Sequence, residues 1–198
     1  MRAQIVLATR NRHKIIELTD MLRGTGIVIA GLDAFPGCPE VIEDGTSFEE
    51  NALKKARAAA GYTGRVALAD DSGLEVDFLG GMPGIYSARY AGEQGNDRKN
   101  NEKLLRELEA VPPEKRGAQF RCVIAIAAPD GRQQVAEGIC RGMVITRPQG
   151  AQGFGYDPIF LYEPLGLTFS EMDAEQKNSI SHRSRALREL KKVLPAFT

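Results

Sequence analysis

The sequence predicts an α/β fold, in which a mixed twisted sheet carries helices on its faces and the chain forms two lobes. Apolar runs of strand length alternate along the chain with stretches where apolar residues recur at helical spacing. Two longer runs flank the turn signal Pro129-Asp130-Gly131 and have the pattern of a hairpin inserted late in the chain. Together these observations indicate a mixed sheet with flanking helices.

The first part of the chain is expected to form two strands and two helices. The strands cover residues 4–8 and 27–30, and the helices cover 14–23 and 48–61. Gly24 should end the first helix, while Ser47 and Glu50 have the spacing of a capping box that opens the second. The second helix should bury one face, made of Phe48, Ala52, Leu53, Ala56 and either Ala59 or Ala60.

Two adjacent acids follow the next strand. Residues 66–69 form an apolar run, Asp70 and Asp71 end it, and the residues from Leu74 to Phe78 alternate as a half-buried strand. Successive side chains of a strand face opposite ways, so both acids could share one cleft only if the backbone turned there. Ser72-Gly73 has the composition of a turn, and we expect the chain to turn at this point. A solvated pair of turn acids is the alternative.

The rest of the chain continues the alternation. Expected elements are a helix over 97–110, the two hairpin strands, a short strand over 159–161, and helices over 173–178 and 181–193. The Gly-rich segment 79–92 carries Tyr86, Arg89 and Tyr90. So many specific side chains argue against a simple linker.

Length and composition restrict the functional classes. A chain of 198 residues suits one domain with two lobes, and 26 basic against 26 acidic residues leave no net charge to draw it to nucleic acid or a membrane. Cys38, Cys122 and Cys140 are far apart, which indicates free thiols in a reducing compartment. With only two histidines, a zinc site is not expected. The N-terminal apolar run is too short for a signal peptide, so a cytoplasmic protein is expected.

The turn between the first strand and the first helix, TRNRHK, is a candidate phosphate site. Thr9, Asn11 and Lys14 lie before or within the first turn of that helix. A helix N-terminus presents amide donors and the positive end of the helix dipole, which both attract phosphate. The motif is not a P-loop, and an ordinary polar cap is the alternative interpretation.

Acidic residues gather in two segments that could hold a metal ion. Glu43 and Asp44 precede the second helix, and Asp70 and Asp71 follow the later strand. Mg²⁺ accepts one or two carboxylates and completes its shell with water and phosphate oxygens, so one acid from each segment would be enough. Solvated loop acids are the alternative.

Two further clusters point to a nucleotide. In GFGYDP, Phe154 offers a flat apolar face and Asp157 a carboxylate, which suit a purine base, although the aromatic residues could instead belong to the core. In EQKNSISHRSRA, Lys177, His182 and Arg183 supply donors beside an expected helix start. A basic helix face with a structural histidine is the alternative there.

Taken together, the clusters describe a site for a nucleoside triphosphate and Mg²⁺. The sequence contains no motif of a covalent nucleophile, such as G-x-S-x-G. Direct attack of water on phosphorus, with a carboxylate as the base, therefore fits these residues best.

Several long motifs occur in the order typical of one known family. They are TRNRHK, ENALKKA, ADDSGLEVDFLGGMPGIYSARYAG, GFGYDPIF and SHR. On these motifs the sequence resembles the inosine triphosphate pyrophosphatases, also described as dITP/XTP or non-standard purine nucleoside triphosphate pyrophosphatases. The resemblance implies a homodimer of α/β subunits, each with a long central nucleotide-binding cleft. It also implies hydrolysis of ITP, dITP and XTP to the monophosphate and pyrophosphate, which cleanses the nucleotide pool.

The resemblance implies roles for individual residues. Glu43 and Asp71 would hold Mg²⁺, and Asp71 would accept the proton of the attacking water. The substrate would contact the residues Thr9, Asn11, Lys14, Ser72, Phe154, Gly155, Tyr156, Asp157, Lys177, His182 and Arg183. We also expect Arg10, Arg12 and His13, which lie in the same turn as Thr9, to contact the substrate. Lys55 and Arg89 match further family positions, and Asp70 is expected to support Asp71. An acceptor facing the purine N1–H, such as Asp157, would favour hypoxanthine and xanthine over adenine.

Arg10 departs from the family pattern, which usually has glycine at this position. A positive φ would be costly for a long side chain, so either the backbone conformation suits arginine or the loop is reshaped. We expect the Arg10 side chain to point along the phosphate chain or to the rim of the site.

Two other functions fit the same residues. One is a pyrophosphatase of the septum-formation-inhibitor-like family, which acts on pyrimidine or modified triphosphates. The other is a non-catalytic nucleotide- or RNA-binding module. The zero net charge argues against RNA, which is bound largely through its phosphates.

Overall fold

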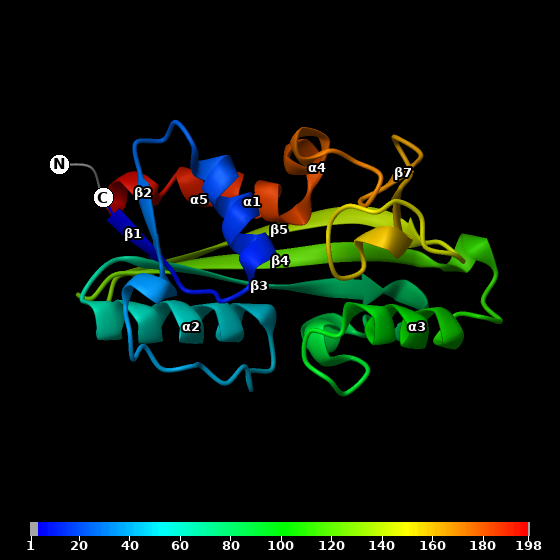
Figure 1. Cartoon of the computed structure of the whole chain (residues 1–198), viewed down its shortest axis with the longest axis horizontal. Coiled ribbons are helices and arrows are strands. Elements are labelled where there is room, and N and C mark those ends of the chain that lie inside the picture. Colours follow the sequence, from blue (N-terminus) through cyan, green and yellow to red (C-terminus); the bar gives the residue numbers. More distant parts are fainter. Residues whose placement is uncertain (1–3, 198) are drawn as a thin grey trace. The chain divides into compact units, whose positions relative to one another are not determined.

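The computed structural model describes residues 4–197, and over that range seven strands form one mixed sheet with flanking helices (Figure 1). The strands are β1 (Gln4–Leu7), β2 (Val28–Gly31), β3 (Ala67–Val76), β4 (Gly117–Ala127), β5 (Gln133–Val144), β6 (Phe160–Tyr162) and β7 (Leu167–Thr168). The α-helices are α1 (Arg12–Leu22), α2 (Phe48–Thr63), α3 (Asp97–Glu107), α4 (Ala174–Ile180) and α5 (His182–Lys191). Within the sheet the strand order is β2-β1-β3-β4-β5-β6-β7.

Both kinds of strand pairing occur, as the sequence predicts. Strand β1 pairs in parallel with β2 and with β3. Strand β6 pairs antiparallel with β5 and with β7. The α/β class and the mixed sheet are therefore confirmed.

The chain divides into two compact units. The first comprises residues up to Asp71, Cys122–Gly138 and the residues from His182 onward. The second comprises Ser72–Arg121 and Ile139–Ser181. Each unit has its own apolar core.

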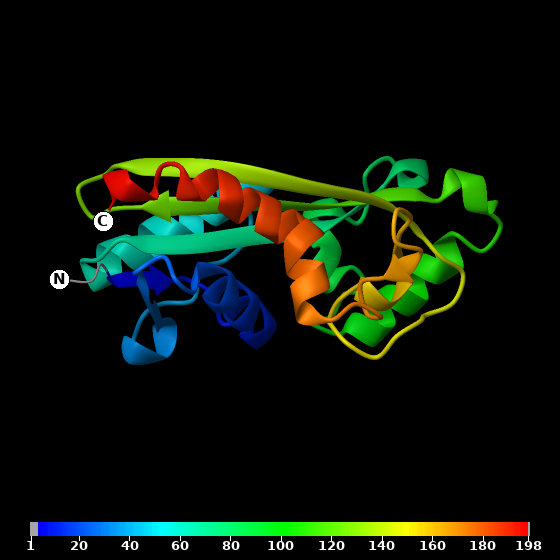
Figure 2. The same cartoon turned by 90° about the horizontal axis from the view of Figure 1, so that it is seen from above.

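In the first unit, helices cover both faces of the sheet. Helices α1 and α5 lie on one face and α2 on the other (Figures 1 and 2). The core of the α1 and α5 side contains Leu18, Leu22, Leu187 and Leu190 from the helices, with Ile5, Leu7, Leu68, Ile124 and Ile126 from the strands. Helix α2 packs through small residues, because Ala52, Ala56, Ala59 and Ala60 are buried. These alanines allow a close approach of α2 to the strands.

The second unit has an aromatic core. Phe120 of β4 stacks on Phe169 with ring centroids 5.5 Å apart. The ring centroid of Phe160, in β6, lies 4.7 Å from that of Phe120. Leu104 and Leu108, from α3 and its C-cap, complete this core. The aromatic contacts hold the short strands β6 and β7 on the sheet.

Most expected elements form close to their predicted bounds. Ser47 caps α2 by accepting a hydrogen bond from the Glu50 amide at 3.1 Å. The Glu50 side chain does not close the predicted capping box, since its Oε2 accepts from Thr46 instead, one residue earlier. The hairpin between β4 and β5 is confirmed, with Ala128 donating to the Arg132 carbonyl across the turn.

The predicted turn at Ser72-Gly73 is wrong. Strand β3 runs without interruption from Ala67 to Val76 through both acids. No turn is needed, because the two carboxylates have separate partners on opposite sides of the strand. The predicted burial of Phe78 is also wrong: the strand ends at Val76, and Phe78 lies in a 3-10 helix with 53% of its surface exposed.

Smaller differences lie in the helices and near the C-terminal strands. Leu53 is half-buried, and the buried face of α2 includes Asn51 in its place. Helix α3 ends at Glu107, short of the predicted residue 110. Strand β7 has only two residues, too few to show a periodicity in the sequence.

The three cysteines are free and buried. Burial raises the pKa of the Cys122 thiol to about 12, so this thiol stays protonated and is a poor nucleophile at neutral pH.

Among residues 4–197, no helix has the length and apolar character needed to cross a membrane.

Candidate active site

The turn between β1 and α1 is organised by Asn11, which caps the helix. Its Oδ1 accepts from the amides of His13 at 3.0 Å and Lys14 at 3.3 Å, and its own amide donates to Thr9 Oγ1 at 3.2 Å. Two of the amide donors expected for phosphate are therefore engaged in capping. Outward, this turn presents the exposed side chains of Arg10, Asn11, Arg12 and His13.

Arg10 fits the loop without backbone strain. Over residues 4–197, only glycines have a positive φ, so the position that is glycine in the resembled family does not require it here. The Arg10 guanidinium donates to the Cys38 carbonyl at 2.9 Å. This contact ties the β1–α1 turn to the loop that carries Glu43.

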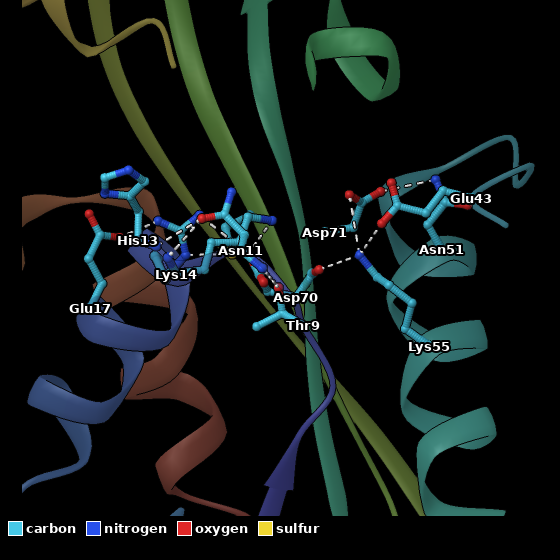
Figure 3. A network of polar contacts seen from close by, with 12 residues as sticks. Thr9, Asn11, His13, Lys14, Glu17, Glu43, Asn51, Lys55, Asp70 and Asp71 are labelled. Atoms are coloured by element: carbon cyan, nitrogen blue, oxygen red, sulfur yellow. Dashed lines mark hydrogen bonds and ion pairs between the residues drawn. The ribbon is translucent and has the colours of Figure 1, made fainter. Parts of the chain in front are cut away.

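Asp70 is the centre of a buried charge cluster. Its side chain is fully buried, and Oδ2 lies 2.9 Å from Lys14 Nζ (Figure 3). The same oxygen lies 3.3 Å from Arg183 Nη2. Arg183, from α5, also pairs with Glu17 of α1. Burial alone would raise the pKa of the Asp70 carboxyl, but Lys14 and Arg183 outweigh it and hold that pKa well below its usual range. Asp70 therefore stays ionised and orients two cationic side chains.

Asp71 faces the other side of β3, toward α2. The Asn51 Nδ2 donates to Asp71 Oδ2 at 3.0 Å, and Lys55 Nζ lies 3.7 Å from Asp71 Oδ1 (Figure 3). Lys55 also contacts Glu43 Oε1 and the Asp70 carbonyl, each at 2.6 Å. Glu43, Lys55 and Asp71 thus meet at one point beside the strand.

The electrostatics of Asp71 differ from those of its neighbour. Burial raises the pKa of the Asp71 carboxyl and the charge of Glu43 raises it further, while Lys55 acts in the opposite direction. For Lys55, burial favours the neutral amine, but Asp71 and Glu43 outweigh it and raise its pKa, so Lys55 is charged. A carboxylate with a raised pKa is a better proton acceptor than an ordinary aspartate.

The residues around Lys55 suit a Mg²⁺ ion. Two carboxylates from separate segments, Glu43 and Asp71, already converge on one cation, the Lys55 ammonium. Mg²⁺ is commonly held by one or two carboxylates together with water and substrate phosphates. Within residues 4–197, no group of three or more His, Cys, Asp or Glu side chains is placed to hold a metal ion. Asp44, the fourth acid of the sequence prediction, is exposed and pairs with Lys54.

The second unit contains a different cluster, centred on Asp157. Its Oδ2 lies 2.6 Å from Lys177 Nζ and accepts from the Phe154 amide at 2.9 Å. Lys177 Nζ lies 4.9 Å from the centroid of the Phe154 ring. At Gly153, a Cβ would lie only 2.2 Å from Asp157 Oδ2, so glycine is required for this close approach. The structure therefore brings Phe154, Asp157 and Lys177 together.

The other expected site residues of the second unit have partners within that unit or lie in strand β3. Tyr156 is buried, and its hydroxyl donates to the Ser87 carbonyl at 2.9 Å, so its ring belongs to the core. The Gly155 amide donates to Asp97 at 2.7 Å. Arg89 lies over the ring of Tyr86, at 5.4 Å from its centroid. Ser72 is half-buried and follows Asp71 in β3.

His182 is the first residue of α5 and is buried. At Gly138 of β5, a Cβ would lie 2.1 Å from the His182 carbonyl, so the start of this helix packs directly on the strand.

The expected site residues divide between the two units. The first unit contains residues 9–14, Glu43, Lys55, Asp70, Asp71, His182 and Arg183. The second contains Ser72, Arg89, 154–157 and Lys177.

The family model of the Ham1 family matches residues 5–193. This chain belongs to the Ham1 family. A dITP/XTP pyrophosphatase of Desulforamulus reducens is 53% identical over 191 residues, which are 96% of this chain and 95% of that protein. A dITP/XTP pyrophosphatase of Nitratidesulfovibrio vulgaris is 52% identical over 202 residues, covering 99% of this chain and 98% of that protein. The family expected from the motifs is confirmed.

Solved structures of Ham1 proteins have the same fold. The Staphylococcus aureus Ham1 protein aligns with a TM-score of 0.87 at 41% identity and covers 98% of this chain and all (100%) of that chain. A HAM1 protein from Coxiella burnetii aligns with a TM-score of 0.88 at 41% identity, over 98% of this chain and 99% of that one. These likenesses support the α/β assignment of this Ham1 family chain.

The sequence motifs of this Ham1 chain did not reveal two residues near the adjacent acids: Glu17, which pairs with Arg183, and Asn51, which donates to Asp71. Glu17 was overlooked because it lies on a helix surface, where acids are usually solvated. Asn51 lies in the ENALKKA motif on the face of α2 that is otherwise apolar. A polar residue on a buried face, four positions before Lys55, was the signal that could have identified Asn51.

Proposed function

We propose that this chain is a Mg²⁺-dependent nucleoside triphosphate pyrophosphatase that hydrolyses ITP, dITP and XTP to the monophosphate and pyrophosphate. Relatives about half identical over nearly the whole chain are curated as dITP/XTP pyrophosphatases, which supports this activity. The observation that carries the proposal is the convergence of Glu43 and Asp71 on Lys55. Two carboxylates placed in this way can supply ligands to Mg²⁺.

Asp71 is the base in this proposal. Its carboxylate, held beside Lys55 and Glu43, would accept the proton from a water that attacks the α phosphorus. Glu43 and Asp71 would hold Mg²⁺, which when bound neutralises phosphate charge and favours phosphoryl chemistry. Lys55 keeps the two carboxylates close together before the metal arrives. Asp70 holds Lys14 at a defined position and is a positioning residue.

The β1–α1 turn contributes the triphosphate contacts in this proposal. Its exposed residues, Arg10 to His13, are polar or cationic, and Lys14 follows them in the first turn of α1. These side chains can neutralise phosphate oxygens, and the helix dipole adds to the attraction.

The base contacts are assigned to the cluster of Phe154, Asp157 and Lys177. Because Asp157 Oδ2 already accepts from Phe154 and Lys177, we assign Asp157 to holding the Lys177 ammonium over the Phe154 ring. A lysine donor is complementary to the 6-oxo group of hypoxanthine and xanthine, and it mismatches the 6-amino group of adenine. The Phe154 ring offers a stacking surface.

The assembly and the compartment complete the proposal. We infer one catalytic domain that comprises both units. Phe78, Met82 and Tyr86 are large apolar side chains within one short segment, and each has at least 40% of its surface exposed. We assign this segment to the contact of a homodimer, since exposed apolar groups mark protein interfaces. Three free cysteines favour the reducing cytoplasm.

Product analysis in water enriched in ¹⁸O tests the function. The purified chain is given ITP, XTP, dITP, GTP, ATP and dTTP, with and without Mg²⁺. We expect rapid turnover of the first three only with Mg²⁺, with the label in the monophosphate. Label in pyrophosphate alone would contradict attack at the α phosphorus. Preference for dTTP would instead favour a pyrophosphatase acting on pyrimidine nucleotides, and no turnover would favour a binding module.

A further inference from the structure

We propose that Asn51 is the positioning residue that fixes the Asp71 carboxylate and the Glu43 loop in one geometry. This inference rests on the proposed function, in which Glu43 and Asp71 hold Mg²⁺. Asn51 is only 1% exposed and lies in the first turn of α2. Its Nδ2 donates to Asp71 Oδ2 at 3.0 Å, and its Oδ1 accepts from the Gly45 amide at 2.9 Å. One side chain thus contacts both segments that carry the acids.

The chemistry of its partners determines the orientation of the Asn51 amide. The Gly45 backbone N–H can only donate, and an ionised Asp71 oxygen can only accept. Oδ1 must therefore face Gly45 and Nδ2 must face Asp71, so a flipped amide would lose both hydrogen bonds. An aliphatic side chain at position 51 would lose both hydrogen bonds, and an aspartate would lose the donor to Asp71.

The contact with Asn51 also distinguishes the two oxygens of Asp71. Oδ2 is directed to the amide of Asn51, whereas Oδ1 is directed to Lys55, at 3.7 Å. Lys55 in turn contacts Glu43 Oε1 at 2.6 Å. Oδ1, the oxygen on the Glu43 side, would therefore be the one available to a metal ion. Helix geometry explains this division, because Asn51 and Lys55 are four residues apart and share one face of α2.

The Glu43 loop is held against α2 by close contacts. A Cβ at Gly45 would lie 2.6 Å from Asn51 Oδ1 and 2.9 Å from the Glu50 Cβ. The backbone conformation of Gly45 is ordinary, with no positive φ, so the close approach alone requires glycine. Glu50 adds a second anchor by accepting from the Thr46 amide at 2.7 Å. The loop two residues after Glu43 is thereby fixed to the same helix turn that orients Asp71.

Binding of Mn²⁺, followed by the loss of its free electron paramagnetic resonance signal, tests this inference without turnover. We expect Asn51→Ala to weaken Mn²⁺ binding by about 10- to 100-fold, the usual effect of losing a partner of a metal ligand. In Gly45→Ala the new Cβ would displace the Asn51 amide from its Oδ1 end, so this variant should also bind Mn²⁺ more weakly. At saturating Mg²⁺, the KM for ITP should return toward the wild-type value, because the defect lies in metal affinity.

Asn100→Ala is the matched control. Asn100 is also buried, at 2% exposure, and also uses both ends of its amide, although both of its partners are backbone groups: Oδ1 accepts from the Ala91 amide and Nδ2 donates to the Ala88 carbonyl. Its loss should lower stability in urea unfolding and leave the Mn²⁺ dissociation constant within about two-fold, because no metal ligand depends on it.

The outcomes separate this inference from the proposed function. If the wild-type chain binds Mn²⁺, Asp71→Asn abolishes binding, and both Asn51→Ala and Gly45→Ala bind normally, the role of Asn51 is overturned while the metal site stands. Equal weakening by Asn100→Ala would also overturn it, since general loosening would then explain the effect. If wild-type protein binds no Mn²⁺, the metal site and this inference fall together. Should Asn51→Ala not fold, Gly45→Ala decides the question.

Discussion

Asp70 and Asp71 are consecutive residues of one continuous strand, and their carboxylates serve different clusters. Asp70 Oδ2 lies 2.9 Å from Lys14, whereas Asp71 Oδ2 accepts from Asn51 at 3.0 Å. The alternation of side chains along a strand directs the first acid toward α1 and α5 and the second toward α2. One carboxyl is thereby held ionised among cations, and the other acquires a raised pKa.

Asp71→Asn should lower the kcat for ITP by about 10²- to 10⁴-fold, the range that a general base contributes. The amide cannot accept the proton from water, and it is a weaker ligand for Mg²⁺. Asp44→Asn is the control, because Asp44 is exposed and pairs with Lys54 away from this cluster. Steady-state kinetics would show the difference, and a nearly active Asp71→Asn variant would remove Asp71 as the base.

Asp70→Asn should act mainly on stability. It leaves the buried charges of Lys14 and Arg183 without their shared carboxylate, and breaking a buried ion pair costs about 3 to 5 kcal/mol. Because Glu17 still pairs with Arg183, we expect the low end of that range. Urea unfolding measures the free energy, and an equal or larger loss in Asp71→Asn would contradict the assignment.

The same cluster predicts a pH dependence of stability. The pKa of Asp70 is lower in the folded chain than its ordinary value of about 3.9, so its contribution is fully present above about pH 4. That contribution is lost as the pH falls through the lower, folded pKa. The difference in unfolding free energy between the wild-type chain and Asp70→Asn should therefore be largest near neutral pH and shrink below about pH 4. A constant difference would mean that Asp70 is not held ionised.

Arg10→Gly should loosen the Glu43 loop. Losing the hydrogen bond to the Cys38 carbonyl costs about 1 kcal/mol, which corresponds to roughly a five-fold rise in the KM for ITP. Amide hydrogen exchange over residues 35–45 should become faster. Arg23→Gly serves as the control, because Arg23 pairs with Asp20 at the exposed end of α1. Unchanged exchange and KM would make Arg10 a spectator.

Lys177→Met should reduce the preference for ITP over ATP by at least about 10-fold in kcat/KM, since one mismatched polar contact is worth about 1 to 3 kcal/mol. Lys103→Met is matched to it, because Lys103 likewise lies over an aromatic ring, at 4.1 Å from the centroid of Tyr90. That control should keep the wild-type preference. If both variants keep the wild-type preference for ITP, Lys177 does not distinguish the 6-oxo group from the 6-amino group.

Phe78→Glu should convert the proposed homodimer to a monomer, because a charge would be buried in an apolar contact. Light scattering over a range of protein concentrations measures the mass. Leu165→Glu is the control, since Leu165 is similarly exposed, at 51%, in a different segment of the same unit. A wild-type monomer, or a Phe78→Glu dimer, would show that this segment is not the contact.

Local patterns in the sequence determined most of the helices and strands, and the family. Helix α2 followed from the Ser47 cap and the spacing of its alanines, and the β4–β5 hairpin followed from its turn residues. These features depend on interactions between residues a few positions apart, which the order of residues states directly. The family likewise followed from long motifs that are specific because they are contiguous.

Only the tertiary structure decided the different partners of Asp70 and Asp71. The sequence suggested a turn after Asp71, whereas the uninterrupted β3 places the two acids on opposite sides. The partners that distinguish them come from distant segments: Arg183 is 113 residues from Asp70, and Asn51 is 20 residues from Asp71. Burial, pKa and orientation depend on which groups meet in space, and that is set by the packing of α1, α2 and α5 on the sheet rather than by any local run of residues.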